Sequence, residues 1–141
     1  MRFERHIYSG KPPTEVLRLV ADFRHLQSWD DSVVSVQPLD EIFGEGSRYR
    51  VRVLFNGNPI DMVYTVLMYE AGVRAVVSGE APKAKATDTI EVASSGEGTI
   101  IKYTAEIDMA FPFNLLDPVF AIGFKKTVDR AAIGLQRFLA S

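Results

Sequence analysis

The sequence contains no cysteine among its 141 residues and only two histidines, His6 and His25. Without cysteine, disulfide bonds, thiolate metal ligands and cysteine nucleophiles are excluded. Neither histidine has a second histidine or a carboxylate at ligand spacing on a helix, so the sequence predicts no metal site. The GxSxG motif, the phosphate-binding glycine loop and the dinucleotide-binding fingerprint are also absent. We therefore expect no cofactor.

The chain is also poor in long apolar runs and in net charge. No stretch is an uninterrupted membrane span, and the N-terminus, MRFERHIYSG, lacks the apolar run of a signal peptide. A net charge of −2 favours neither nucleic acid nor an acidic membrane as a partner. Apolar residues make up 47% of the sequence, enough for the core of one ordinary domain. We expect a cytoplasmic protein with one domain over residues 1–141, a monomer or homodimer without stable membrane insertion.

The C-terminal segment, residues 112–141, carries the clearest pattern in the chain. Its apolar residues recur at three- and four-residue spacing, which predicts one long amphipathic helix. The apolar stripe consists of Leu116, Phe120, Phe124, Val128, Ala131, Leu135 and Phe138. Asp117 before Pro118 suits a helix start, with a capping carboxylate followed by proline at the first position. Asn114 offers an alternative cap one turn earlier.

The outer side of this predicted helix is apolar in its first half, where Leu115, Val119 and Ile122 lie outside the stripe. A helix that is apolar nearly all round needs cover on more than one side. We expect this surface to be buried under loops. The alternatives are the mouth of a cavity, a dimer contact or a lipid-facing patch.

The rest of the chain predicts mainly strands, with two short helices after the first of them. The expected order is a strand at 2–9, a helix at 14–23, a short helix or turn at 24–28, and strands at 33–39, 47–55, 60–68, 73–78, 86–94 and 99–109. Val73, Ala75 and Val77 are expected to face inward, and residues 79–85 are expected to form a loop. The bulky stripe of the long helix must be covered. We therefore predict an α+β fold in which a curved antiparallel sheet of about seven strands wraps around the C-terminal helix.

Two hairpins set the predicted inward face of the sheet. The first turns at residues 56–59, and a four-residue turn there puts every apolar pair on one face. Its predicted pairs are Phe55 with Ile60, Val53 with Met62, Val51 with Tyr64 and Tyr49 with Val66, with Arg48, Arg50 and Arg52 pointing away. The second turns at residues 95–98. Its predicted pairs are Ser94 with Thr99, Val92 with Ile101, Ile90 with Tyr103, Asp88 with Ala105 and, on the other face, Glu91 with Lys102.

Asp88 is the most informative residue on the predicted inward face. A lone carboxylate in an apolar interior is unfavourable unless it is paired or protonated. Beside the inward tyrosines it could orient a polar group of a ligand or act as an acid or base. The alternative is that the register slips by one residue and Asp88 is solvated.

A second candidate group is His25, Trp29 and Asp30, at the junction between the short helices and the next strand. We expect Trp29 to anchor this junction. The functional alternative places it at the entrance of a cavity.

This order of elements resembles the START/polyketide-cyclase/birch-pollen-allergen superfamily, also called SRPBCC or helix-grip. The marks are Pro12-Pro13 followed by TEVLRLVADF, the segment HLQSWDDSVVSV, the strands GSRYRVRV and GTIIKYTAEID, and the closing helix. The resemblance covers essentially the whole chain. It implies a cavity between helix and sheet that takes apolar small molecules, lipids or polyketides. Some members of such a family are cyclases or dehydratases, and others are ligand carriers or sensors.

The expected partner is therefore a small hydrophobic ligand, bound by a carrier or sensor. The candidate ligand-binding residues are Tyr49, Val51, Val53, Tyr64, Val66, Asp88, Ile90, Tyr103, Phe120, Phe124 and Val128. The rival is a polyketide cyclase or dehydratase in which Asp88 or His25 moves a proton and a tyrosine stabilises an enolate. A third hypothesis is an interaction module whose apolar helix half docks a partner protein.

Overall fold

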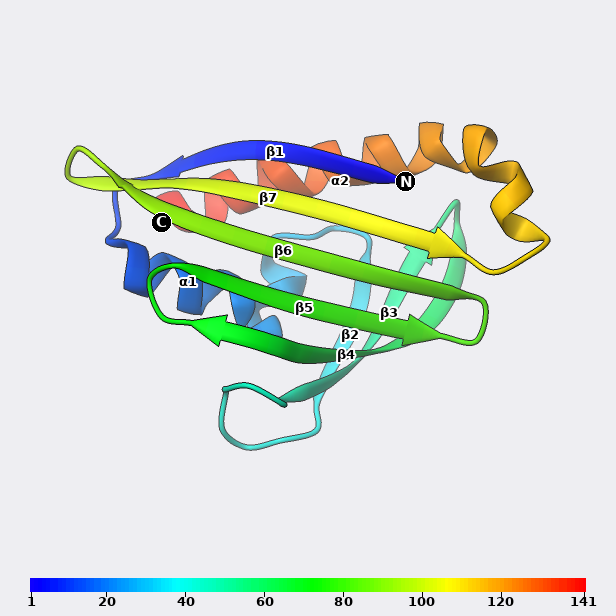
Figure 1. Ribbon diagram of the computed structural model, residues 1–141, viewed down its shortest axis with the longest axis horizontal. Helices are drawn as coiled ribbons and strands as arrows, with labels where there is room; N and C mark the ends of the chain where they lie inside the picture. Colours follow the sequence, from blue (N-terminus) through cyan, green and yellow to red (C-terminus); the bar gives the residue numbers. More distant parts are fainter.

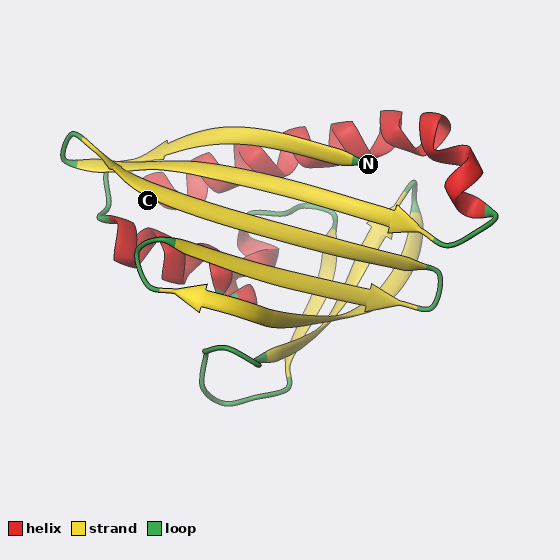
Figure 2. Ribbon diagram, in the orientation of Figure 1, coloured by secondary structure: helices red, strands yellow, loops and turns green.

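The computed structural model describes residues 1–141, which form one seven-stranded antiparallel sheet with helices on its concave side (Figures 1 and 2). The strands lie side by side in the order β1-β7-β6-β5-β4-β3-β2. The elements are β1 (Arg2–Ser9), α1 (Pro13–Ala21), the 3-10 helix η1 (Phe23–Ser28), β2 (Val33–Pro38), β3 (Arg48–Phe55), β4 (Asn58–Glu70), β5 (Arg74–Ala81), β6 (Ala84–Ser95), β7 (Gly98–Met109), the 3-10 helix η2 (Phe113–Leu116) and α2 (Asp117–Ala140). The predicted α+β helix-grip fold is confirmed.

The sheet curves so that β2 and β3 cross behind the long strands β5, β6 and β7 in the view of Figure 1. Two helical units fill the space it encloses. The helix α1, with η1, covers one end of the sheet, and α2 runs along β1 to the other end (Figure 1). This division of the concave face decides which inward residues belong to the solid core and which are free to line a cavity.

The first helix forms because its N-terminal proline and its apolar spacing agree. Pro13 occupies the first turn, where a missing N–H is harmless, and Val16, Leu17 and Val20 are fully buried against the sheet. The helix ends at Ala21, two residues earlier than predicted, because Asp22 has an extended backbone. Asp22 then caps η1 by accepting a hydrogen bond from the Arg24 N–H, and it accepts another from the Tyr49 hydroxyl at 3.0 Å.

The long C-terminal helix α2 is 24 residues long and has buried residues only from its middle onward. Its buried residues are Val128, Ala131, Leu135 and Leu139. Asp117 lies in the first helical turn and Leu116 occupies the cap position, where no side chain caps the helix. The predicted cap at Asp117 is therefore wrong, because η2 already carries the chain into the helix. No helix of the protein has both the length and the apolar character needed to cross a membrane.

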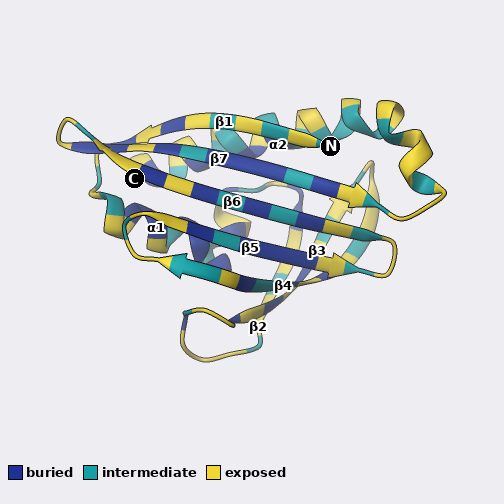
Figure 3. Ribbon diagram, in the orientation of Figure 1, coloured by how far each residue is buried: buried dark blue, intermediate teal, exposed yellow.

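The predicted burial of the first half of this helix under loops is wrong. The first turns of α2 extend past the end of the sheet, and they carry no buried residue (Figure 3). Leu115, Val119 and Ile122 are 68%, 66% and 65% exposed. An apolar patch of Phe111, Leu115, Leu116, Val119 and Ile122 therefore faces solvent.

The β3–β4 hairpin has a tighter turn than predicted. Phe55 pairs with Asn58, so the turn consists of Asn56 and Gly57 alone, with φ angles of 51° and 79°. An Asn-Gly pair adopts these positive angles readily and forms a two-residue hairpin turn. The predicted pairs are therefore wrong by two residues, and Tyr49 pairs with Tyr64 instead of Val66. A shift of two keeps every side chain on its predicted face, so Arg48, Arg50 and Arg52 are exposed as expected.

The β6–β7 hairpin has the predicted register, with Asp88 opposite Ala105 and Ile90 opposite Tyr103. The neighbouring β5 differs from the prediction at both ends. Val73 lies in the turn before the strand and is 47% exposed, whereas Ala75 and Val77 are fully buried as expected. Residues 79–85 do not form a loop, because β5 continues to Ala81 and β6 begins at Ala84.

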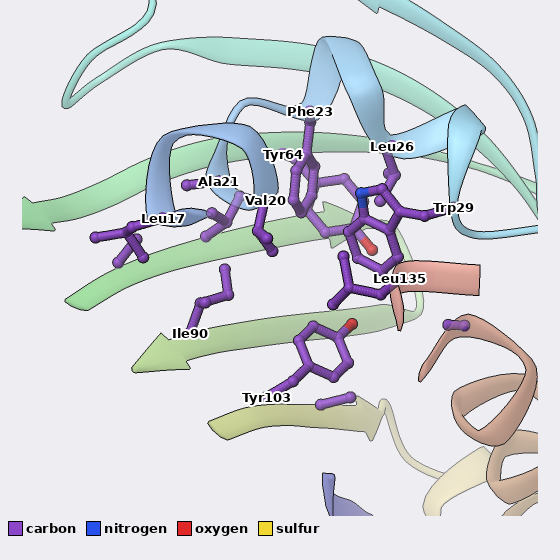
Figure 4. Close-up of a cluster of buried hydrophobic side chains, with 14 of the residues drawn as sticks. Leu17, Val20, Ala21, Phe23, Leu26, Trp29, Tyr64, Ile90, Tyr103 and Leu135 are labelled. Atoms are coloured by element: carbon purple, nitrogen blue, oxygen red, sulfur yellow. The ribbon is translucent and has the colours of Figure 1, made fainter. Parts of the chain in front are cut away.

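Trp29 anchors α2 to the junction between η1 and β2. Its ring is 3% exposed and meets Tyr103 edge to face, with ring centroids 5.9 Å apart (Figure 4). A Cβ atom at Gly134 of α2 would collide with the backbone carbonyl oxygen of Trp29. The absence of a side chain at Gly134 thus brings the helix against the Trp29 backbone, and the predicted role of Trp29 as an anchor agrees with this packing.

Candidate functional site

A cavity lies between the inner face of the sheet and the middle of α2. Strands β3, β4, β6 and β7 form its floor, and α2 closes it with Phe124, Val128 and Ala131. Nineteen residues line it, of which 14 are hydrophobic. Small side chains on the floor, Ala84, Ala86 and Ala105, leave the space open. The cavity therefore lies where small side chains of the sheet face α2.

The cavity is small. The space open to the centre of a water molecule is about 70 Å³. Because one buried water needs about 10–15 Å³ on this measure, the cavity has room for about five waters. Five water molecules in the liquid occupy about the same volume as an apolar protein cavity that binds one benzene molecule. A larger ligand would have to extend toward solvent between the β3–β4 turn and α2.

Aromatic rings surround that opening. Phe55 at the end of β3 lies 5.7 Å from Phe120 and 6.4 Å from Phe124, measured between ring centroids. Phe124 also meets Phe3 of β1 at 5.6 Å. The Asn56 side chain contacts α2 at Gly123, where a Cβ atom would collide with it. The hairpin tip and the helix thus touch through a few side chains, and the exposed apolar patch of α2 begins directly beyond them.

Two carboxylates and two tyrosines face each other inside the cavity. Asp88 comes from β6, Tyr103 from β7, Tyr64 from β4 and Asp30 from the loop between η1 and β2. Tyr64 reaches across its neighbour β5 because Gly79 has no side chain: a Cβ atom there would lie 2.6 Å from the tyrosine ring. The polar groups of an otherwise apolar cavity are therefore concentrated in this cluster of Asp30, Tyr64, Asp88 and Tyr103.

Asp88 is only 9% exposed and forms no ion pair. Burial raises its pKa from 3.8 to about 7, and the nearby carboxylate of Asp30 acts in the same direction. The nearby Tyr103 hydroxyl partly offsets both effects, because it favours the charged form of the carboxylate. Asp88 therefore changes its charge near neutral pH, which is the range in which a general acid or base operates.

Asp30 is held more firmly than Asp88. Its Oδ1 atom accepts hydrogen bonds from the Ser32 backbone N–H at 3.0 Å and from the Ser32 hydroxyl at 2.7 Å. Burial nevertheless raises the pKa of Asp30 above its usual value, because the lowering by these two bonds is smaller. Burial and the two carboxylates also raise the pKa values of Tyr64 and Tyr103 well above 10, so both hydroxyls keep their protons.

The structure brings six of the eleven predicted site residues to the cavity and places five elsewhere. Those that line it are Val53, Tyr64, Asp88, Tyr103, Phe124 and Val128. Those that do not line it are Tyr49, Val51, Val66, Ile90 and Phe120.

The five residues that do not line the cavity lie in two different places. Val51, Val66 and Ile90 are at most 1% exposed and belong to the solid core. Figure 4 shows Ile90 facing Leu17 and Val20 of α1. Tyr49 lies in this core too, with its hydroxyl bonded to Asp22. Phe120 instead stays half-buried at the rim of the cavity. Strand alternation identifies the inward face correctly but does not say which helix covers each part of it.

The hypothesis that His25 transfers a proton requires it to lie near the carboxylates of the cavity, and His25 does not lie there. Its ring packs on Phe138, with centroids 5.8 Å apart, and it does not line the cavity. Asp30, five residues later, lines the cavity instead of His25. The only indication of this in the sequence is that Asp30 is a carboxylate directly after Trp29. Ile60 and Met62, which also line the cavity, alternate with Tyr64 along β4 and were recognisable from that period.

The family to which the chain belongs is visible in its sequence as well as in this geometry. The sequence matches the family described as "Polyketide cyclase / dehydrase and lipid transport" over residues 1–139. No curated protein matches the chain. The family match therefore covers the sheet, the cavity and all but the last two residues of the chain.

Several solved structures share the fold at low sequence identity. A protein from Thermus thermophilus is 22% identical, with a TM-score of 0.79 over 99% of this chain and 95% of its own. A START superfamily protein from Mycobacterium smegmatis is 13% identical, with a TM-score of 0.80 over 98% and 96%. The Zhui aromatase/cyclase from a Streptomyces species is 13% identical, with a TM-score of 0.75 over 99% and 90%.

At these identities the likeness shows the fold alone, and the family match carries the assignment. The helix-grip architecture, the cavity beneath α2 and the match over residues 1–139 agree with one another. The chain belongs to the polyketide cyclase/dehydrase and lipid transport family.

Proposed function

We propose that this protein binds a small hydrophobic ligand in the cavity between the sheet and α2, as a carrier or sensor. The observation that carries the proposal is the cavity itself, in which 14 of 19 lining residues are hydrophobic and Asp30, Asp88 and two tyrosine hydroxyls form a polar cluster. Ligand sites are typically concave and mostly apolar, with a few convergent polar groups that fix orientation. The cavity volume favours a ligand whose buried part is about the size of one aromatic ring.

The opening supports a ligand that enters past the first half of α2. That half meets the sheet through a few side chains: Phe55 contacts Phe120 and Phe124, Phe3 contacts Phe124, and Asn56 lies against Gly123. Few buried apolar contacts hold this part of the helix, so it is the part that opens most easily. The exposed apolar patch beyond it would keep a hydrophobic ligand in contact with apolar surface during entry.

Filling the cavity should weaken ligand binding. Ala105 lies on the cavity floor opposite Asp88, and Ala105→Leu adds three carbon atoms to a space of about 70 Å³. We expect benzyl alcohol, measured by calorimetric titration, to bind the wild type and to lose at least about tenfold in affinity for this variant. Thermal stability should change little, because the new side chain occupies existing space rather than displacing neighbours.

Ala93→Leu is the matched control, since Ala93 lies on β6 and is exposed on the opposite face of the sheet. It should bind benzyl alcohol as the wild type does. Equal binding by the Ala105→Leu variant would place the ligand outside the cavity and defeat the proposal. Native mass spectrometry of the protein purified from cells gives a second readout, in which a co-purifying molecule should be present in the wild type and lost in Ala105→Leu.

The second candidate function is an enzyme of the cyclase or dehydratase kind. The observation that favours it is Asp88, whose pKa of about 7 suits proton transfer, next to the Tyr103 hydroxyl. In that case Asp88→Asn would abolish turnover while binding survives. The third candidate, a protein interaction module, is favoured by the exposed patch at Leu115, Val119 and Ile122.

A further inference from the structure

The charges inside the cavity all have the same sign. Its lining contains three carboxylates, Asp30, Asp88 and Glu106, and it contains no lysine, arginine or histidine. Glu106 lies toward the outside, where Arg2 reaches it at 3.8 Å. Asp30 and Asp88 have no cation within ion-pair distance. Arg130 of α2 pairs with the exposed Asp31 at 3.1 Å, and its charge lowers the pKa of Asp30 by less than burial raises it. The protein therefore leaves a negative cluster inside an apolar space without an ion-pair partner.

Within this cluster, the charged form of Asp88 has the least favourable environment. More than nine-tenths of its surface is buried, and the only donor that the protein places near it is the Tyr103 hydroxyl. A carboxylate has about four lone-pair sites and is normally satisfied by several donors when it is buried. Its remaining capacity is directed into the cavity, which it lines. A bound molecule that donates hydrogen bonds there would satisfy it.

We propose that the ligand carries a cationic nitrogen, a protonated amine on an apolar body of about one ring, which Asp88 and Asp30 bind between the rings of Tyr64 and Tyr103. This inference rests on the proposed binding function and specifies the class of its ligand. An ammonium group donates up to three charge-assisted hydrogen bonds and neutralises the repulsion between the two carboxylates. The faces of tyrosine rings also attract cations. A ligand carboxylate would add a further negative charge to the cluster, and a hydroxyl would leave the repulsion in place.

Three ligands of nearly equal shape separate these cases: benzylamine, benzyl alcohol and benzoate. In calorimetric titrations at about pH 8, we expect benzylamine to bind at least about tenfold more tightly than benzyl alcohol, and benzoate more weakly than either. Asp88→Asn and Asp30→Asn should each reduce the ratio of benzylamine affinity to benzyl alcohol affinity at least about threefold. Asp108→Asn, an exposed carboxylate on β7, is the control and should change nothing.

The preference should also depend on pH. The groups that face Asp88 are Asp30 from the loop before β2, Tyr64 from β4 and Tyr103 from β7, and α2 contributes no charged side chain to the cavity. Both tyrosines stay neutral, so only the carboxylates titrate in the working range. Since the pKa of Asp88 is raised to about 7, affinity for benzylamine should rise between about pH 5.5 and about pH 8.5, and binding should release protons. Benzyl alcohol should show neither effect.

The outcomes also separate this inference from the proposed function. If benzyl alcohol binds the cavity, as the loss in Ala105→Leu would show, and benzylamine has no advantage, the inference is overturned and the binding function stands. If benzoate binds best, the inference is likewise overturned. If none of the three binds, both the inference and the one-ring cavity site are contradicted. A preference for the amine that persists unchanged in Asp88→Asn and Asp30→Asn would also overturn it, because the cation would then bind elsewhere.

Discussion

Asp88→Asn should raise the stability of the free protein at pH 8 by about 2 kcal/mol, which for a chain of this length is roughly 5–10 °C in melting temperature. The pKa of Asp88 is about 7 in the folded protein against an ordinary 3.8, so the folded state holds this proton more tightly than the unfolded state. The contribution of Asp88 to the free energy of unfolding is therefore largest in acid. It falls as pH rises from about 4 to about 7 and stays low above pH 7. The full shift corresponds to at most about 4 kcal/mol, and the partly unsatisfied amide of the variant offsets some of the gain.

The advantage of the variant should be lost below about pH 3, where Asp88 is protonated in both states of the wild type. Thermal unfolding by circular dichroism across this range measures it directly. Asp108→Asn on the exposed face serves as the control and should change stability by only a few tenths of a kcal/mol at any pH. A variant less stable than the wild type at pH 8 would show that Asp88 is charged and satisfied in the folded protein, and a gain independent of pH would contradict its raised pKa.

Gly134→Ala should destabilise the protein by about 3 kcal/mol, even though alanine is the better helix former by about 1 kcal/mol. The added Cβ atom would collide with the carbonyl oxygen of Trp29, which is backbone and cannot turn aside. The helix would have to move outward and loosen the packing of Leu135 and Trp29, both of which are at most 3% exposed. Urea unfolding followed by tryptophan fluorescence is suited to this variant, since Trp29 is the only tryptophan and reports from the contact itself.

Gly123→Ala is a matched control on the same helix. A Cβ atom there would meet the end of the Asn56 side chain, which can rotate away, so the gain in helix propensity should leave stability equal or up to about 1 kcal/mol higher. Opposite signs for the two substitutions would establish that α2 is fixed at Trp29 and only lightly held at the hairpin tip. Equal effects would contradict that division of the helix.

Most of the fold could be predicted from the sequence because its two periodicities are clear. The alternation in residues 86–109 determined the register of β6 and β7, including Asp88 opposite Ala105, since only one pairing puts all apolar residues on one face. The first hairpin was placed two residues out of register because face matching cannot tell a two-residue turn from a four-residue turn. The Asn56-Gly57 pair carried the missing information, as its preference for positive φ angles selects the tight turn.

The site was less predictable than the fold. Tyr64, Asp88 and Tyr103 were found because each lies on an inward strand face, but Val51, Val66 and Ile90 share that face and lie in the solid core. The boundary between core and cavity depends on where α1 ends and where α2 crosses the sheet, and these are contacts between distant segments. Asp30 reaches the cavity from a loop, which has no period to show which way its residues point. The overhang of α2 likewise depends on the length of the sheet rather than on the helix.

The most direct test of a ligand site beneath α2 is methyl NMR on the protein with labelled alanine, isoleucine and valine, in the presence of benzyl alcohol. We predict nuclear Overhauser contacts from the ring protons of the ligand to the methyl groups of Ala105, Ile107 and Val128, which surround the cavity. Contacts to Val119 and Ile122 alone would instead show that the ligand sits on the exposed patch of α2, and would contradict the central claim.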